Sequence, residues 1–524
     1  MPVASSADLY VVGGYLILVT ALGCLMSTRT HTAREFIAAG GSLPGWVVGL
    51  SIIGTFVSSI SFIAHPGKTY SGTWNPFVFS LSLPYAAWVS TRYFVSWFRN
   101  SGSLSAYEYL EICFGSWARL YAAGFNILYH IGRIGAILFG VSLAVSALIQ
   151  VPVPVIIVVL GVLVIAYTLV GGIEAVIWTD VLQSIILVGG MLLCAGVLLM
   201  KVPGGFAGVV HGAQTPEMNK LSLGSMDLSF ATSTFWTMLV FGFFINLQNF
   251  AADQTFVQRY FTARSEGEAV RSVWMGALAY LPISAVLFFI GTGLYVFYGT
   301  NGALPEGTPA DRVLPHFIMN ELPTGASGLL IAAILAAAMS TVDSSLNSSA
   351  TLMLCDIRNR FFRSAGDEPS KDASAPGDNP YRSPTELRQQ DQGELRFLRL
   401  MTILIGIAGV GAALAMIGVQ QMLDMWWQLS GILSGGTLGL MLLARFTRVR
   451  GPRAAAAGVM TGITTILIIT LAHQTDPAVW LTPVVTACAP VRNYFDPLMA
   501  IVAGTFMVTA VAWLASFLTG ERSH

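Results

Sequence analysis

A run of small and hydroxyl-bearing residues interrupts the apolar segment at residues 329–354, with the sequence AAMSTVDSS at residues 337–345. On a helix, the carbonyl of Ala337 and the hydroxyls of Ser340 and Thr341 share one face, because they are three and four positions apart. Hard cations bind oxygen, and neutral oxygens suit a monovalent ion better than the carboxylate-rich shells that bind calcium. The spacing therefore predicts a sodium site. The alternative is that both hydroxyls bond to carbonyls one turn earlier, as is common in membrane helices.

Two ionisable residues, Asp343 and Arg133, lie within apolar segments, where charged groups are functional candidates by default. Arg133 is too far from either end of its segment to reach the membrane surface easily. Its guanidinium needs a partner, and its planar fork matches a carboxylate in a bidentate pair. The partner is expected to be a substrate carboxylate or, alternatively, a fixed acid or the free carbonyls of a broken helix.

The composition places the chain in a membrane. Of its 524 residues, 54% are hydrophobic and 10% are charged, and the mean hydropathy is +0.68, whereas about a quarter of the residues in soluble domains are charged. Thirteen apolar runs are long enough to cross a bilayer as helices, at residues 9–27, 45–65, 74–97, 117–149, 152–170, 174–200, 229–257, 272–298, 325–356, 395–417, 423–444, 454–473 and 495–518. We therefore expect an all-α polytopic protein of the cell membrane, surrounded by lipid.

Basic residues predict the orientation, because Lys and Arg accumulate in cytoplasmic loops. With the N-terminus outside and the C-terminus inside, 21 of the 27 Lys and Arg residues fall in cytoplasmic segments, including Arg259, Arg264 and Arg271. Five fall outside and Arg133 falls within a span. The same topology accounts for the basic loops, so no nucleic-acid partner is expected.

Polar residues interrupt two of the predicted spans at corresponding places. The second span has glycines and hydroxyls across its middle (GLSIIGTFVSSIS, residues 49–61), and the seventh carries amides and an acid (GFFINLQNFAAD, residues 242–253). Broken helices at matching positions of two five-helix halves are typical of inverted-repeat transporters. The alternative is that these small residues merely let neighbouring helices approach closely.

These patterns divide the chain into four parts. Residues 1–43 are expected to form an extra N-terminal helix, a retained anchor rather than a signal peptide, and a cytoplasmic loop. Residues 44–223 would form the first inverted repeat (core helices 1–5), residues 224–446 the second (core helices 6–10), and residues 447–524 two additional helices. Residues 364–392, rich in Ser, Pro, Asp and Gln, are expected to be a mobile cytoplasmic loop.

Several motifs resemble those of the sodium:solute symporter family. The run GGIEAVIWTDVLQ at residues 171–183 resembles the entry into the family's fifth core helix, AAMSTVDSSLNS at residues 337–348 resembles its eighth, and DQTFVQRY at residues 253–260 resembles a further element. Within the family, SSISF (58–62), PGKTY (66–70), SAYEYLE (105–111) and HIGR (130–133) resemble the bacterial sialic acid symporters. The resemblance implies a LeuT-like core of 5+5 inverted repeats with broken helices, within about 13 transmembrane helices.

The resemblance also implies where sodium, the co-transported ion, would bind. One ion would lie between the second and ninth spans, held by the carbonyls of Gly54, Val57 and Ala337 and the hydroxyls of Ser340 and Thr341. An additional sodium site would be formed by Asp180 with Ser340, Asp343 and Ser344.

The acid at Asp343 is a departure from the sialic acid symporters. Two carboxylates close together in a low dielectric either share a cation or force one of them to keep a proton. Asp343 therefore leaves three options open: a stronger second sodium site, a proton site, or an acid that faces the cytoplasmic vestibule. For Asp180 the alternative is a structural cap near the cytoplasmic end of its helix.

The substrate site implied by the resemblance centres on Arg133. In the sialic acid subgroup the matching arginine holds the carboxylate of the substrate, and Ser58 and Ser61 would add hydroxyl contacts. Phe56 and Ser80 stand where those transporters have Thr and Gln, so an altered pocket is expected.

Together, these features predict a sodium-coupled secondary active symporter that imports a small organic solute by alternating access. A carboxylated sugar such as sialic acid is the preferred substrate; a neutral sugar or another small organic anion is the alternative. A solute sensor with a transporter-like domain is the rival from another class. An enzyme is not expected, because the sequence contains no HExxH, GxSxG or His-rich set. The oligomeric state is not predicted.

Overall fold

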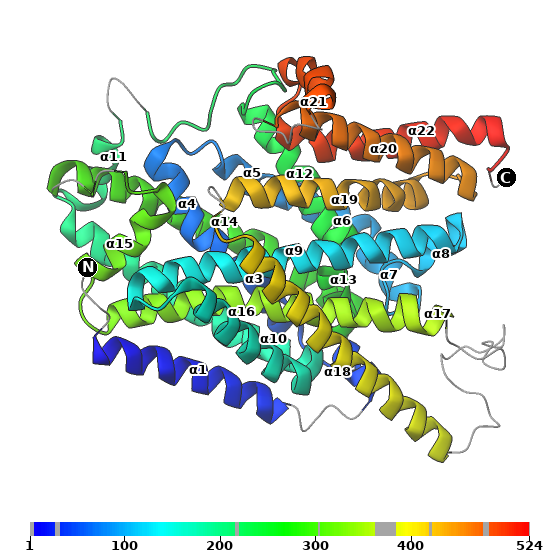
Figure 1. The fold of residues 1–524 in the computed structure, drawn as a ribbon, viewed down its shortest axis with the longest axis horizontal. Helices are drawn as coiled ribbons and strands as arrows, with labels where there is room; N and C mark the ends of the chain where they lie inside the picture. Colours follow the sequence, from blue (N-terminus) through cyan, green and yellow to red (C-terminus); the bar gives the residue numbers. More distant parts are fainter. Residues whose placement is uncertain are drawn as a thin grey trace.

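A computed structural model describes residues 5–26, 32–214, 219–301, 304–305, 307–361, 384–418, 422–474 and 482–522, and within them the protein is helical, without β-strands. The helices are α1 (Ser6–Met26), α2 (Ala33–Ala38), α3 (Gly45–Phe56), α4 (Ser59–Ser71), α5 (Phe77–Leu81), α6 (Leu83–Tyr93), α7 (Val95–Asn100), α8 (Glu108–Phe114), α9 (Ser116–Ile149), α10 (Val153–Lys201), α11 (Gly205–Gly212), α12 (Phe235–Ala252), α13 (Gln254–Thr262), α14 (Glu266–Asn301), α15 (Val313–Glu321), α16 (Ala326–Leu352), α17 (Asn359–Phe361), α18 (Pro384–Ala415), α19 (Met422–Phe446), α20 (Pro452–Ala472), α21 (Thr482–Cys488) and α22 (Ala500–Thr519). A π-helical turn, Met353–Arg358, joins α16 to α17. The axes of most of the long helices are roughly aligned, and α18 crosses them obliquely (Figure 1).

The thirteen predicted spans are mostly helical where the structure describes them, but they are not thirteen uninterrupted helices. Among the described residues, ten helices are long and apolar enough to cross a membrane, and the bent pair α3 and α4 makes an eleventh crossing if it is one span. The predicted spans at 152–170 and 174–200 are the two limbs of α10, and the span at 74–97 is divided among α5, α6 and α7. The count of thirteen crossings stays a prediction.

The two limbs of α10 meet at Gly172 without a connecting loop. Gly172 has φ 60° and ψ −162°, a conformation that residues with a side chain rarely adopt. A Cβ at this position would lie 2.9 Å from Cα of Phe36, so a backbone segment also fills the space that a side chain would need. Both constraints explain a glycine at this point of the GGIEAVIWTDVLQ motif.

Both predicted helix breaks are confirmed. The axes of α3 and α4 differ by 55°, and Ser58 begins α4 by accepting a hydrogen bond from the amide of Ser61 (3.3 Å). Asp253 separates α12 from α13 in an extended conformation, and its carboxylate accepts from the amide of Thr255 (2.8 Å). Each break therefore has a polar residue that caps the following helix.

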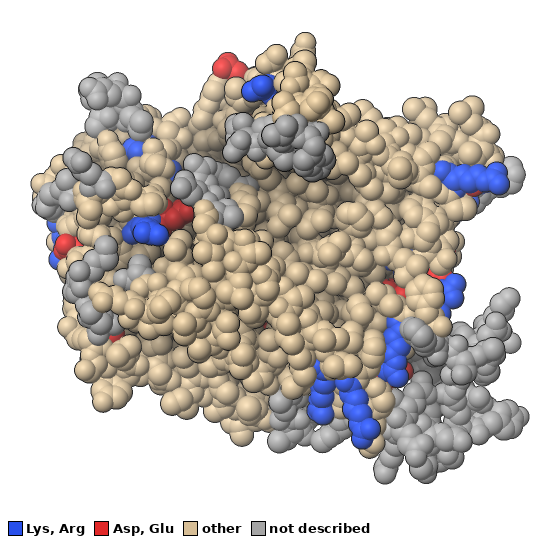
Figure 2. Space-filling view, viewed as in Figure 1, with Lys and Arg blue, Asp and Glu red and all other residues tan. Residues whose placement is uncertain are grey.

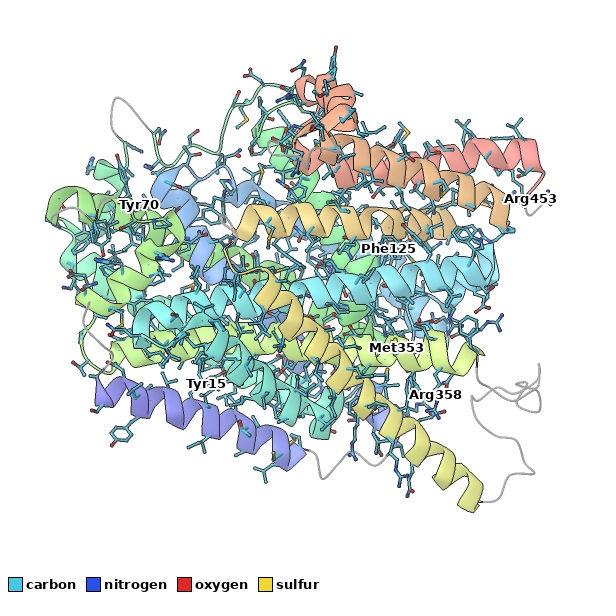
Figure 3. The ribbon with its side chains drawn as sticks, in the orientation of Figure 1. Tyr15, Tyr70, Phe125, Met353, Arg358 and Arg453 are labelled. Carbon is cyan, nitrogen blue, oxygen red and sulfur yellow. The ribbon has the colours of Figure 1, made fainter. Side chains whose placement is uncertain are left out.

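Helix α16 runs through the interior and is buried nearly throughout. It packs against α10, α9, α1, α18 and α3. The first helix is attached to it at two places: Asp8 Oδ1 accepts from the amides of Gly325 and Gly328, both at 2.8 Å, and the hydroxyl of Tyr15 lies 3.6 Å from Sδ of Met339. Tyr15 is labelled on α1 in Figure 3. The predicted extra N-terminal helix is thus joined directly to the centre of the bundle.

Charged side chains are separated by a wide uncharged band. On the face in Figure 2 they lie toward the left and top, and again toward the right and lower right. Helix α1 begins toward the left of the bundle and α22 ends toward the right (Figure 1), which agrees with an odd number of crossings. Which end faces the cytoplasm stays a prediction.

Two expectations about loops were wrong. Arg259 was counted with the cytoplasmic loops, but it lies on α13 and is fully buried. Residues 384–392 belong to α18 rather than to a mobile loop; they begin with a proline, which is favoured in the first turn of a helix, and continue with strong helix formers. The rest of that predicted loop, residues 364–383, lies outside the described residues.

Candidate functional site

The break between α3 and α4 frees backbone oxygens in the interior of the bundle. In an unbroken helix the amide of Ser58 would donate to the carbonyl of Gly54, but it donates to the carbonyl of Phe56 instead (3.1 Å). The amide of Ser61 likewise donates to Ser58 Oγ rather than to the carbonyl of Val57. The carbonyls of Gly54 and Val57 have thus lost their helical donors, and such carbonyls commonly coordinate sodium in inverted-repeat transporters.

Helix α16 supplies the other three predicted sodium ligands. Thr341 Oγ1 donates to the carbonyl of Ala337 (3.0 Å), which is the backbone bond given above as the alternative. Ser340 does not form such a bond, because its hydroxyl donates to Asp180 Oδ1 (2.5 Å). A Cβ on Gly54 would lie 2.8 Å from Ser340 Oγ, so α3 lies directly against α16 at this point. The donor set consists of carbonyl and hydroxyl oxygens, which fits sodium as a transported ion.

This close approach gives the first prediction. Replacing Gly54 with alanine is expected to raise the sodium concentration needed for half-maximal uptake about tenfold, because the methyl group would displace the Ser340 hydroxyl and overpacking costs about 1–3 kcal/mol. Uptake measured against sodium concentration tests this. Gly124→Ala is the matched control, since a Cβ there has no atom within 4 Å. An unchanged sodium dependence in Gly54→Ala would place the ion elsewhere.

Asp180 lies within α10 at the centre of a buried polar cluster. Its Oδ1 accepts from Ser340, and its Oδ2 accepts from the hydroxyl of Ser51 and from Arg259 Nη2 (2.9 Å). The same nitrogen of Arg259 donates to Ser344 Oγ (2.6 Å). All these donors are side chains of other helices, so the alternative reading of Asp180 as a helix cap is wrong. The cluster joins three of the residues predicted for the additional sodium site, but Arg259 supplies its positive charge.

Asp343, the fourth of those residues, has a different partner. Its Oδ2 accepts from the hydroxyl of Tyr167 (2.8 Å), and its Oδ1 has no hydrogen-bond partner among the described residues. Asp343 is fully buried, so the option of an acid open to a vestibule is wrong for this structure. The sodium and proton options stay open.

Four of the five predicted substrate residues line one cavity: Phe56, Ser58, Ser61 and Arg133. The fifth, Ser80, is not among its lining residues; it is buried against α14, where its hydroxyl lies 2.7 Å from that of Ser284. The reason is geometric, because α5 is a short helix that faces both α12 and α14. Ser80 therefore lies behind the wall of the cavity, beside the lining residue Tyr280, and its part in substrate binding stays a prediction.

Arg133 contacts both kinds of internal partner that the sequence analysis considered, a backbone carbonyl at a helix break and a fixed acid. Its Nη2 donates to the carbonyl of Thr55, which the helix break has freed (2.8 Å), and its Nη1 lies 4.0 Å from Asp253 Oδ2. Nη1 itself has no hydrogen-bond partner among the described residues. One terminal nitrogen of the guanidinium is thus held by the backbone, while Nη1 is buried and faces Asp253.

Sequence reasoning missed several residues of this region. Eight more polar or aromatic residues line the cavity: His65, Phe79, Tyr129, Asn249, Tyr280, Trp426, Trp427 and Ser430. It also missed that Arg259 pairs with Asp180 and that Asp253 faces Arg133. The available signal was DQTFVQRY, which places an acid and an arginine beside a predicted helix break.

Comparisons with known proteins agree with this geometry. The model of the sodium:solute symporter family matches residues 36–374. The chain is 33% identical to the sodium/sialic acid symporter SiaT of Proteus mirabilis over 462 residues, 87% of each chain. The chain belongs to the sodium:solute symporter family. It is also 31% identical to the sodium/sialic acid symporter NanT of Aliivibrio fischeri, covering 86% of this chain and 85% of that one.

A solved member of the family has the same fold. It is a Na⁺-coupled sialic acid symporter, substrate-bound and outward-open, in which a novel Na⁺ site is described; the TM-score is 0.84, the identity 29% and the coverage 99% of both chains. The predicted all-α, LeuT-like fold is thereby confirmed, as is a multi-pass membrane location. The family's members are transporters, which confirms that this symporter is not an enzyme.

Proposed function

We propose that this symporter imports a carboxylated sugar of the sialic acid class together with sodium. The observation that carries the proposal is Arg133 in the wall of a cavity that serines and aromatic side chains also line, with a guanidinium nitrogen that has no hydrogen-bond partner among the described residues. A guanidinium binds a carboxylate in a bidentate pair, and serine hydroxyls bond to sugar hydroxyls. The two relatives SiaT and NanT are both named as sodium/sialic acid symporters.

Sodium would couple to the substrate through the broken α3. The proposed ion ligands are Gly54, Val57, Ala337, Ser340 and Thr341, with Asp180, Asp343 and Ser344 at the additional site. The carbonyl of Thr55, next to Gly54, accepts the hydrogen bond from Arg133. An ion that fixes the carbonyls of the break would thereby also fix the guanidinium that receives the substrate.

We further infer that transport proceeds by alternating access, with the N-terminus outside and repeats at residues 44–223 and 224–446. Helices that are broken beside the site allow one part of the bundle to rock against the other. The membrane potential contributes as well, at about 2.3 kcal/mol per charge for each 100 mV.

The test is uptake of radiolabelled sialic acid into proteoliposomes with and without an inward sodium gradient. Uptake by the wild type is expected to depend on sodium, and Ser340→Ala is expected to lower the sodium-driven rate at least about tenfold, since a hydrogen bond to a charged group contributes about 1.5–3 kcal/mol. Ser142→Ala is a matched control, because Ser142 is a buried serine without a hydrogen-bond partner in the described structure.

Competition with unlabelled solutes separates the substrate classes. Phe56 stands where the sialic acid symporters have a polar residue and offers no hydrogen bond to a sugar hydroxyl, which makes a small organic anion the second candidate. Inhibition by lactate or pyruvate but not by sialic acid would support that candidate, and inhibition by glucose or galactose would support a neutral sugar. Uptake that is equal with and without a sodium gradient would contradict sodium coupling.

A further inference from the structure

Asp253 has one carboxylate oxygen with a structural role and one without a partner. Oδ1 accepts from the amide of Thr255 (2.8 Å) and so caps α13. The same oxygen lies 3.3 Å from His130 Nε2. Oδ2 has no hydrogen-bond partner among the described residues, and Asp253 is fully buried. A buried carboxylate oxygen without a donor is costly, which calls for an explanation.

The oppositely charged group that faces Asp253 Oδ2 is the guanidinium of Arg133. Its Nη1 lies 4.0 Å from Oδ2, which is an ion pair but too long for a direct hydrogen bond. Nη1 also has no hydrogen-bond partner in the described structure. Two opposite charges therefore face each other, each with unused hydrogen-bonding capacity. Arg133 lines the cavity, whereas Asp253 is not among its lining residues.

We propose that Asp253 is the resident counter-ion of Arg133. It neutralises the guanidinium while the pocket is empty, is replaced by the carboxylate of the substrate when the substrate binds, and pairs with the guanidinium again after release. This rests on the proposed function, because it assumes a substrate that carries a carboxylate. Asp253 acts through Arg133 and not by contact with the substrate, so it is a positioning residue.

A counter-ion of this kind suits a carrier, which must release what it binds. In a low dielectric an uncompensated guanidinium would hold a carboxylate very tightly, and slow release would limit transport. Asp253 lowers that affinity because it stabilises the guanidinium in the empty site, and this stabilisation is given up when the substrate carboxylate binds. Bonds from Thr255 and the neighbouring His130 keep its other oxygen in place throughout.

The arrangement also gives sodium an electrostatic role. The charges of Arg133 and Asp253 cancel in the empty pocket, so a substrate carboxylate adds one uncompensated negative charge. The sodium ion proposed at the α3 break adds the positive charge that balances it. Without the charge of Asp253 the substrate would be balanced by Arg133 alone, and its binding would depend less on sodium.

Asp253→Asn tests the proposal, because asparagine keeps the capping oxygen and removes the charge. The dissociation constant of sialic acid is measured by calorimetry on the purified full-length protein with saturating sodium and without sodium, and uptake is measured in proteoliposomes. We expect binding to become at least about fivefold tighter, the effect of sodium on binding to shrink by a similar factor, and the maximal uptake rate to fall because release is slower.

Two controls make the result specific. Asp356→Asn removes a different fully buried carboxylate, which pairs with Arg119 at 2.5 Å outside the cavity, and is expected to leave the dissociation constant unchanged. On an Arg133→Ala background, Asp253→Asn is expected to give no tightening.

The possible failures are distinguishable. A wild type that does not bind sialic acid refutes the proposed substrate. A wild type that binds it while Asp253→Asn binds equally or more weakly refutes the counter-ion alone. If Asp253→Asn and Asp253→Ser both fail to fold while Asp356→Asn folds, the role of Asp253 is structural and the proposal is overturned.

Discussion

Replacing Arg133 with alanine is expected to abolish sodium-driven uptake of sialic acid and to weaken its binding at least about a hundredfold. The guanidinium is the one cation found among the residues that line the cavity in the described structure. A bidentate pair contains two charge-assisted hydrogen bonds of about 1.5–3 kcal/mol each, so its loss costs about 3 kcal/mol or more. Calorimetry and proteoliposome uptake on the same preparation measure both effects.

Arg133→Lys is the informative companion. Lysine keeps the charge but not the planar fork, and cannot bond to the Thr55 carbonyl and to a carboxylate in the same geometry. We expect it to bind sialic acid weakly and to transport it slowly. If Arg133→Ala transported sialic acid normally, the guanidinium of Arg133 would have no part in substrate binding, and Asp253 would be its sole ionic partner.

Replacing Arg259 with alanine is expected to destabilise the protein more than any other single change considered above. Arg259 and Asp180 form a fully buried pair at 2.9 Å, and removing one partner of a buried pair costs about 3–5 kcal/mol because the other charge is left uncompensated. Thermal unfolding of the purified protein, with and without sodium, measures the loss. Arg264→Ala is the control, since Arg264 follows the same helix but is exposed.

The double replacement Arg259→Met with Asp180→Leu separates charge from packing. Removing both charges is often neutral or stabilising, so the double variant is expected to regain most of the lost thermal stability. Its stability is expected to respond less to sodium, because Asp180 belongs to the proposed additional site. A melting temperature of Arg259→Ala equal to that of the wild type would mean that Asp180 does not need Arg259 as its counter-charge.

The sequence was informative where one chemical requirement decides the residue. A cation site needs clustered oxygens, so spacing alone was enough to propose Ser340 and Thr341 as sodium ligands, which stays a prediction. A helix break inside a membrane needs residues that satisfy the backbone, so the interruptions near Ser58 and Asp253 were visible as polar residues in apolar runs. These features depend on local sequence, and the structure confirms both helix breaks.

Pairing between distant segments could not be derived in the same way. Arg259 was placed in a loop because it follows an apolar run, whereas its burial depends on Asp180, 79 positions earlier in the chain. Ser80 could not be separated from the pocket residues, since the orientation of a short helix is set by the helices packed around it. Substitutions such as Phe56 indicate a changed pocket, but its new shape depends on neighbours such as Tyr280.

The attachment of α1 to α16 makes the first helix a suitable place for a fluorescent label. Asp8 and Tyr15 join the first helix to the two ends of the segment that leads to the proposed sodium ligands, while Tyr10 on the same helix is 80% exposed. A fluorophore at position 10 would therefore move with α16 without entering the bundle. Single-molecule distance measurements from that position would follow the transport cycle from the lipid-facing side, with every residue of the binding sites left intact.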